Sequence, residues 1–457
     1  MKVAIKILAG GLFALCVFAH AIGATLTTLV SFNGTNGASP EASLLLAANG
    51  DFYGTTTAGG TNNNGTVFRV SPFGAFATLY LLNPADGFTS QSGLTLGADG
   101  NYYGSANHGG SSGVGTIFRL TTNDVFSPVL SFAVTNGGFP IARMIQGQDR
   151  FLYGTTAIGG TNSGGTVFRL GTNGQLSILA SFSSSGNNGY SPFGHLLQLP
   201  DGTLYGTAFQ GGTNGLGAIF KLSTNGPISP VFSFNGTNGA NPYSGLIQGN
   251  DGAIYGTTFF GGTNGNGTIF KLLTNGTLTS LVSFGTTNGA NPQASLVQAS
   301  DGFLYGVTAF GGIYTNQSGV GYGTIFRFTT NGAFTSLLSF GNTNGANPEG
   351  GLTIGPDGNL YGTTAGGGTT SNGTVFRFTI VPPQAPLIRK IEPIGGTIQM
   401  TWSAQAGPTY QVQYTTNLTS AGWNDLGGII PATNTLMSTV DSSGAEPKRF
   451  YRIEVFQ

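Results

Sequence analysis

The chain has 457 residues, and Asp, Glu, Lys and Arg together make up only 7% of them, against roughly 25% in an ordinary soluble domain. The formal net charge is zero, which argues against binding to nucleic acid or to an anionic membrane surface, because both need a dense basic face. The 79 glycines follow no three-residue period and separate short apolar runs, which excludes a collagen-like chain and indicates the many tight turns of an all-β protein.

The first 24 residues have the parts of a secretory signal peptide. Lys2 and Lys6 precede an apolar run, and small residues up to Ala21 or Ala24 offer a cleavage site. The run is too short for a confident membrane span, and no second one follows. The only cysteine of the chain also lies here. We therefore expect export to the medium, the periplasm or the cell surface, without a disulfide in the mature protein.

Two short strings recur along most of the chain. A Tyr-Gly string, which reads Tyr-Gly-Thr-Thr in four copies, is followed each time by a Gly-Thr/Ala-Val/Ile-Phe-Arg/Lys string. The tyrosines of the seven copies are Tyr53, Tyr103, Tyr153, Tyr205, Tyr255, Tyr305 and Tyr361. This spacing of 50 to 56 residues indicates a repeat architecture with one supersecondary unit per copy. We interpret the first string as structural, with a buried aromatic ring, a glycine where blades pack closely, and threonines suited to a pleated strand.

The repeat in residues 240–284 shows the pattern of strands and turns. Asp-Gly and Asn-Gly pairs supply the positive backbone angles that tight hairpin turns need. They separate four predicted strands at residues 243–248, 253–258, 267–272 and 278–284. Four antiparallel strands in each of seven repeats predict a seven-bladed β-propeller over residues 25–380.

The seventh repeat has no fourth strand of its own, because the chain continues directly into Pro382 and Pro383. A segment of the fourth-strand type, residues 25–32, precedes the first repeat instead. We predict that this segment is the outer strand of the seventh blade. Such pairing would close the ring and hide the edges of an open sheet.

The composition changes after the last repeat. Residues 381–386 read as a stiff Pro-rich linker. Residues 387–457 contain both tryptophans and three segments that alternate like half-buried strands, at residues 397–402, 410–414 and 449–455. They predict a small C-terminal β-sandwich, near the size at which one core is just sufficient.

The string Tyr-Gly-Thr-Thr-x-x-Gly-Gly-Thr-Asn-x-x-Gly-Thr-Val-Phe-Arg resembles the GloVer tandem repeat of bacterial exported proteins, over residues 25–380. The resemblance implies export but no defined molecular function. The family has varied C-terminal anchors, whereas this chain ends without an apolar helix or a basic tail, so we expect simple secretion. The C-terminal part resembles a fibronectin type III-like module, with Trp402 as its core tryptophan and Tyr451 in a late strand.

Most charges of the predicted propeller occupy two repeat positions. The cations are Arg69, Arg119, Arg169, Lys221, Lys271, Arg327 and Arg377, and the acids are Asp99, Asp149, Asp201, Asp251, Asp301 and Asp357. One interpretation is a charged ring that binds an ion or a ligand. We favour the structural interpretation, in which Asp before Gly makes a turn and the cation packs its stem and pairs locally at a blade edge.

The sequence shows no catalytic signature. The remaining acids of the predicted propeller are Glu41, Asp51, Asp86, Asp124 and Glu349, which we interpret as solvated loop acids, although the blades could bring some of them together as glycoside hydrolysis requires. His108 and His195 are too few for a metal site of three or four ligands. A Gly-x-Ser-x-Gly elbow is absent, although spacing alone leaves a Ser-His-Asp arrangement open. We expect no catalytic residue, no metal and no cofactor.

The longer loops and the more variable positions are expected on one face of the ring. The residues just before Gly-Gly differ among the copies, and repeat proteins commonly place their variation on the binding face. The candidate ligand-binding residues at this position are His108, Gln210, Phe260 and Phe310. The alternative explanation is drift in surface loops.

Uncharged amide, hydroxyl and aromatic groups suit sugars or a neutral protein surface. We therefore predict a non-catalytic exported binding or scaffold protein, a monomer whose partner is a glycan or an envelope protein. The alternative is a polysaccharide-active enzyme, a hydrolase or a lyase, with residues near the ring axis chosen from Asp86, Asp124, Glu349 and His108. A purely structural role also fits the sparse charge.

Overall fold

The protein is all-β. The computed structural model describes residues 25–184, 186–223, 227–379, 386, 388–394, 397–404, 409–416, 422–431, 436–442 and 449–456. The predicted signal peptide and most of the predicted linker lie outside these residues. Within them every regular element is a strand, so no helix there is long and apolar enough to cross a membrane. The chain divides into two compact units, and the larger one contains residues 25–299 and 304–380.

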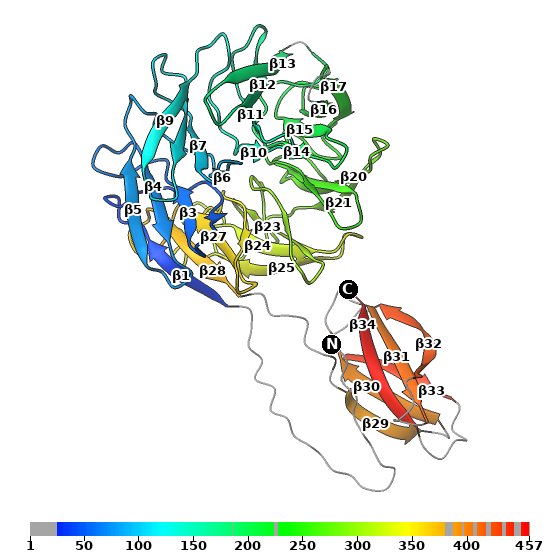
Figure 1. Ribbon diagram of the computed structural model, residues 1–457. Coiled ribbons are helices and arrows are strands. Elements are labelled where there is room, and N and C mark those ends of the chain that lie inside the picture. The colour runs from blue at the N-terminus through cyan, green and yellow to red at the C-terminus, as the bar shows by residue number, and fades with distance from the viewer. Residues whose placement is uncertain are drawn as a thin grey trace. The chain divides into compact units, whose positions relative to one another are not determined.

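Seven four-stranded antiparallel sheets make up the larger unit and follow one another around a ring (Figure 1). Sheet 1 contains β2 (Leu45–Leu46), β3 (Phe52–Thr55), β4 (Thr66–Val70) and β5 (Phe76–Leu81). Sheet 2 contains β6 (Thr95–Leu96), β7 (Tyr102–Ala106), β8 (Thr116–Leu120) and β9 (Phe126–Ser131). Sheet 3 contains β10 (Ile145–Gln146), β11 (Leu152–Thr156), β12 (Ser163–Leu170) and β13 (Leu176–Ser183). In each sheet the chain runs from a short inner strand outward to the rim.

The next three sheets repeat this order. Sheet 4 contains β14 (Leu197–Gln198), β15 (Leu204–Ala208), β16 (Ala218–Leu222) and β17 (Ser229–Ser233). Sheet 5 contains β18 (Ile247–Gln248), β19 (Ile254–Thr258), β20 (Thr268–Leu272) and β21 (Leu278–Ser283). Sheet 6 contains β22 (Val297–Gln298), β23 (Leu304–Thr308), β24 (Thr324–Phe328) and β25 (Phe334–Ser339). The predicted second, third and fourth strands are therefore present in all six.

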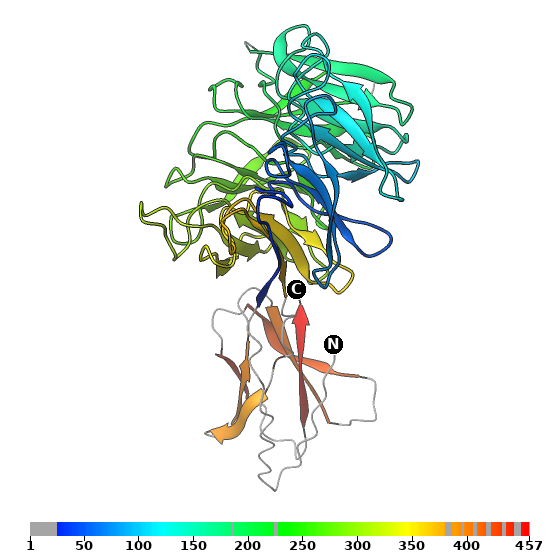
Figure 2. The ribbon, with the colours of Figure 1, turned by 90° about the vertical axis from the view of Figure 1, so that its left-hand side faces the viewer.

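Sheet 7 is completed by the N-terminal strand, as predicted. Its inner strands are β26 (Thr353–Ile354), β27 (Leu360–Thr364) and β28 (Thr374–Phe378), and β1 (Leu26–Ser31) pairs antiparallel with β28. The register joins Leu26 to Phe378 and Ser31 to Thr374. Figures 1 and 2 both show β1, in dark blue, beside the gold β28. The two ends of the repeat region are thus joined through backbone hydrogen bonds.

In several repeats the tyrosine forms a hydrogen bond to the aspartate four residues before it. Tyr255 donates its hydroxyl proton to Asp251 at 2.7 Å, and Tyr153 donates to Asp149 at 2.6 Å. The Asp251 carboxylate also accepts the backbone N–H of Ala253, which holds the turn. These bonds confirm the structural interpretation of the repeated aspartates.

The repeated cations also have local partners. The Nζ atom of Lys271 lies 2.7 Å from Asp251, and the guanidinium of Arg169 lies 4.6 Å from the centre of the Phe151 ring. Arg69 forms an ion pair with Asp124 at 2.9 Å. Stem packing and local pairing at the blade edge, as expected, account for these three positions.

The glycine of the Tyr-Gly string has a different role from the one predicted. A Cβ atom at Gly256 would lie 2.6 Å from the ring of Phe270, which is its cross-strand partner in the same sheet. The corresponding Gly54 would meet Phe68 at 2.4 Å. The glycine therefore makes room for an aromatic ring within a blade, and the expected close contact between blades is wrong for this position.

The threonines of the same string join the sheets. In several repeats the first threonine donates to a backbone carbonyl of the next sheet, as Thr207 does to Ser244 at 2.9 Å and Thr363 does to Ala42 at 3.0 Å. The second lies 2.8 Å from a threonine of the third strand, as for Thr258 and Thr268. The string thus specifies both the sheet and its link to a neighbour.

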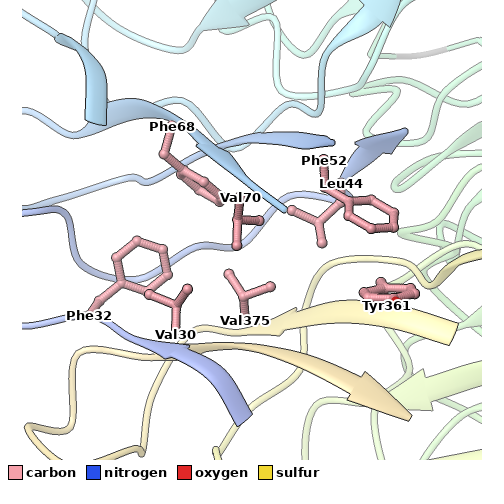
Figure 3. Packing of buried hydrophobic residues seen from close by; sticks show 8 residues of the cluster. All are labelled: Val30, Phe32, Leu44, Phe52, Phe68, Val70, Tyr361 and Val375. Atoms are coloured by element: carbon pink, nitrogen blue, oxygen red, sulfur yellow. The ribbon is translucent and has the colours of Figure 1, made fainter. Parts of the chain in front are cut away.

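The hydrophobic cores lie between successive sheets. Figure 3 shows the core between sheets 7 and 1, where Val30 and Phe32 point toward Phe68 and Val70. The ring centres of Phe32 and Phe68 are 5.3 Å apart, in an edge-on arrangement. Each core therefore depends on two repeats, which explains why a single repeat cannot bury its apolar face alone.

The smaller unit contains two three-stranded sheets. One has the order β29 (Ile388–Ile394), β30 (Thr397–Ser403) and β33 (Leu436–Asp441), and the other β32 (Asn424–Pro431), β31 (Thr409–Thr415) and β34 (Phe450–Phe456). Trp402 of β30 and Tyr410 of β31 share one buried cluster, which joins the sheets. The three predicted strands correspond to β30, β31 and β34, whereas the other three were not predicted.

Candidate binding site in the central channel

A channel with a volume of about 620 Å³ is lined by residues from all seven sheets. Its wall is the segment that precedes the first strand of each sheet. In sheet 1, Ala42 and Leu44 are buried, whereas Glu41 and Ser43 alternate with them and are less buried. The prediction of a six-residue first strand at 243–248 is wrong, because only Ile247–Gln248 pairs with the second strand. The carbonyl oxygen of Ser244 instead accepts a hydrogen bond from Thr207 of the preceding sheet.

Two positions in each segment line the channel. We define the mouth ring as the residues that follow the loop leading into each sheet, namely Glu41, Gln91, Ile141, Phe193, Tyr243, Gln293 and Glu349. We define the deep ring as the residues two positions later, namely Ser43, Gly93, Arg143, His195, Gly245, Ser295 and Gly351. The residue between the two positions is always Ala, Ser or Gly. The repeats therefore vary on the channel wall as well as at the position before Gly-Gly.

One side of the mouth ring is acidic. Glu41 accepts hydrogen bonds from the Thr57 hydroxyl at 3.1 Å and from the Gln91 amide at 2.7 Å. Glu349 comes from the neighbouring sheet 7, and burial together with the Glu41 charge raises the pKa of Glu349 to about 7. The interpretation of these two acids as solvated loop residues is therefore wrong.

The side formed by sheets 4 and 5 is aromatic. The rings of Phe193 and Phe209 stack with centres 4.9 Å apart, and Tyr243 meets Phe193 edge-on at 5.1 Å. Burial, with the charges of Glu349 and Glu41, raises the pKa of Tyr243 to about 12. The Tyr243 hydroxyl therefore stays protonated at neutral pH. The two glutamates of the acidic side interact electrostatically with this hydroxyl.

The deep ring holds a neutral histidine beside an arginine. The Nδ1 atom of His195 lies 3.0 Å from the carbonyl oxygen of Leu196, so this nitrogen is the donor and Nε2 is left as an acceptor. Burial and the neighbouring Arg143 charge lower the pKa of His195 to about 4. The imidazole is therefore uncharged at neutral pH, while Arg143 keeps its charge.

Gly245 makes room for the His195 ring. A Cβ atom at this position would lie 2.4 Å from Cδ2 of His195. We expect Gly245→Ala to lower the free energy of unfolding by about 1–3 kcal/mol, because added carbon atoms in a packed site force neighbours from their positions. Urea denaturation followed by circular dichroism measures this loss.

Two further variants control for the change of residue type. Gly285→Ala meets no atom closer than 3.6 Å, so it should cost much less than Gly245→Ala. The combination of Gly245→Ala with His195→Ala should cost less than the sum of the single changes, because the clash is removed. Additive losses would contradict a direct contact between Gly245 and His195.

The four candidates chosen from the sequence are not among the residues that line the channel. His108, Gln210, Phe260 and Phe310 each form an isolated antiparallel bridge to the loop that leads into their sheet. His108 packs against the ring of Phe88, with centres 5.4 Å apart. The four residues occupy equivalent positions in different sheets. Their role as ligand contacts stays a prediction.

Most acids proposed for the enzyme alternative have structural partners. Asp86 accepts hydrogen bonds from Tyr80 and Asn83, and Asp124 pairs with Arg69. Glu349 alone among the residues named for that alternative lines the channel. Among the residues that the structure describes, no three His, Cys, Asp or Glu side chains gather as a metal site would require.

The repeats also match a known family. A family model for the Gloeobacter/Verrucomicrobia repeat matches residues 10–199, 146–320 and 195–445. The chain belongs to this repeat family. The resemblance found from the Tyr-Gly-Thr-Thr string is thereby confirmed. No curated protein matches this member of the repeat family.

Several solved structures resemble this member of the repeat family distantly. A Bacteroides uniformis protein assigned provisionally as a 6-phosphogluconolactonase is 16% identical, with a TM-score of 0.48 over 85% of this chain and 98% of its own. A polysaccharide lyase, an ulvan lyase, is 10% identical, with a TM-score of 0.47 over 77% of this chain and 96% of its own. The gluconolactonase XC5397 of Xanthomonas campestris is 13% identical, with a TM-score of 0.41 over 69% and 90%. At these values the likeness assigns no activity.

Proposed function

We propose that the protein is an exported binding protein that holds a saccharide in the central channel. One observation carries the proposal: aromatic rings from sheets 4 and 5 and carboxyl and amide groups from sheets 7, 1 and 2 line the same channel. Apolar faces of sugar rings pack on aromatic side chains, while sugar hydroxyls donate to carboxylates and amides. The channel volume of about 620 Å³ also falls in the range of ligand sites.

The proposal includes the finer architecture. The seven sheets are the blades of a β-propeller closed by residues 25–32, and the two C-terminal sheets are a fibronectin type III-like β-sandwich. The N-terminal basic and apolar segment directs export. The exported protein is a monomer. The variation among repeats at the mouth and deep rings supports the channel as the site, because structural positions of the same repeats stay nearly constant.

Tyr243→Ala is the direct test of the saccharide site. We expect the purified mature chain to bind members of a glycan panel, and the substitution to weaken that binding about tenfold or more, because it removes a ring and a hydroxyl donor from the channel wall. Calorimetric titration with the best glycan measures the change. Tyr314→Ala is the control, since Tyr314 is 54% exposed and lies outside the channel. Equal loss in both variants, or no glycan binding by the unsubstituted chain, would overturn the proposal.

The second candidate is a polysaccharide-cleaving enzyme. Glu349 with a pKa of about 7 lies in the same channel as Glu41, and a carboxyl group that is still protonated near neutral pH can act as a general acid. The same glycans are incubated with the protein and assayed for new reducing ends. Release by the unsubstituted chain and its loss in Glu349→Gln would replace the binding proposal with this one.

A further inference from the structure

Arg143 of the deep ring has no partner for its charge within the described part of the chain. No ion pair or hydrogen bond joins it to those residues, and the ion pairs there involve other cations. Its alkyl stem lies near Gly93, where a Cβ atom would meet Cδ of Arg143 at 3.3 Å. The guanidinium is therefore held at the channel wall with its donors unused.

An unpaired guanidinium at a partly buried site indicates an anionic ligand. Burial lowers the pKa of Arg143, but a guanidinium keeps its proton in proteins. A buried charge without a partner is costly, and a bound carboxylate or sulfate would offset that cost through charge-assisted hydrogen bonds. The planar guanidinium of Arg143 can donate two parallel hydrogen bonds to two oxygens of such a group.

Two serines of the deep ring add donors of the same kind. Ser43 accepts the backbone N–H of Gly351 at 2.8 Å, and Ser295 accepts that of Gly245 at 3.1 Å. Each hydroxyl therefore has its own proton left to donate. The neighbouring His195 is uncharged and does not compete with Arg143 for an anion. Arg143 and the two serines thus offer donors, whereas the acidic side of the mouth ring offers acceptors.

We propose that the deep ring binds a carboxylate or sulfate group of the ligand through Arg143, with Ser43 and Ser295 as further donors. This inference rests on the proposed function and narrows it: the saccharide is acidic. Its charged group occupies the deep ring, its hydroxyls donate to Glu41 and Glu349, and its ring packs on the aromatic side. A neutral saccharide leaves the guanidinium unpaired and is therefore bound less tightly.

Matched ligands test the inference on the whole mature chain. The probes are an oligogalacturonate, its neutral methyl ester of the same length, and a neutral oligosaccharide with and without sulfate groups. We expect at least one acidic probe to bind about 10- to 100-fold more tightly than its neutral counterpart. The first pair tests carboxylate and the second tests sulfate, so the preferred anionic group is identified by the same titrations.

Substitution of Arg143 locates the effect. Arg143→Met should remove the preference for the acidic probe, chiefly by weakening the binding of that probe, whereas Arg143→Lys should keep part of the preference. Arg150→Met, an exposed arginine in a turn, is the matched control and should change neither affinity. Circular dichroism melting verifies that each variant is folded, and Arg143→Lys provides the second reading if Arg143→Met unfolds.

The outcomes distinguish this inference from the proposed function. Equal affinity for acidic and neutral probes, or a preference that survives in Arg143→Met, overturns the acidic ligand and leaves saccharide binding standing. Failure of the unsubstituted chain to bind any probe of the panel overturns saccharide binding and the acidic ligand with it.

Discussion

Phe32→Ala is expected to lower the free energy of unfolding of the repeat region by about 3–5 kcal/mol. Phe32 is fully buried directly after β1, and its ring contacts Phe68 and Phe76 at centre distances of 5.3 and 5.6 Å. The substitution leaves a cavity at the junction where the N-terminal strand closes the ring. Guanidinium denaturation followed by far-ultraviolet circular dichroism measures the loss.

The chain offers an internal control for this result. Both tryptophans lie in the C-terminal segment, so tryptophan fluorescence reports on the smaller unit, and its transition should not move in Phe32→Ala. Phe73→Ala removes a ring that is 89% exposed and should change stability by about 0.5 kcal/mol or less. A loss below about 1 kcal/mol for Phe32→Ala would show that closure by β1 contributes little.

The repeat made most of the fold predictable. Turn sequences of fixed chemistry flank the second, third and fourth strands, so the prediction of 253–258 differs from β19 (Ile254–Thr258) only at its first residue. The missing strand of the last repeat predicted the pairing of β1 with β28. The inner strands were predicted too long, because the residues before them bind the neighbouring sheet, and a contact between repeats is invisible within one repeat.

The C-terminal strands show what happens without repetition. Trp402 and Tyr451 alternate with less buried residues, and their strands were predicted. In β32 (Asn424–Pro431) two glycines and a proline hide the strand pattern, and its pairing with β31 is a tertiary effect. β29 and β33 also pair only through β30, so no local signal defined them.

The channel residues were missed for a geometric reason. Arg143 and His195 are far apart in the sequence, and only the closure of the ring brings their segments to one axis. A signal was present, since the residue after the loop proline changes from Glu41 to Phe193 to Tyr243 among otherwise similar repeats. The prediction instead followed variation at the position before Gly-Gly, where the four candidates do not line the channel.

Two channel residues are expected to give the protein opposite pH dependences of stability. The pKa of Glu349 is about 7 in the folded chain against a usual 4.5, so the folded state holds a proton that the unfolded state releases. This contribution to stability is complete below pH 4.5 and is lost as the pH rises through about 7. The pKa of His195 is about 4 against a usual 6.5, so its contribution is complete above pH 6.5 and is lost as the pH falls through about 4.

These two dependences should offset each other in the unsubstituted chain between pH 4.5 and 6.5. We therefore expect Glu349→Gln to become more stable with rising pH across this interval, and His195→Gln to become less stable, each by on the order of 2 kcal/mol. Urea denaturation at closely spaced pH values measures the slopes. The double substitution is the control, because it should restore a profile parallel to that of the unsubstituted chain.

Opposite slopes in the single variants cannot come from a general effect of net charge. Each substitution removes one titrating group from the same channel, so the change in overall charge repulsion is small. Such a change would not give the two variants slopes of opposite sign. Aspartates such as Asp251, whose pKa is low despite burial because Lys271 and Tyr255 donate to it, act below this interval. Parallel profiles in the two single variants would show that the channel holds Glu349 and His195 in water-like surroundings, and the general-acid alternative would lose its support.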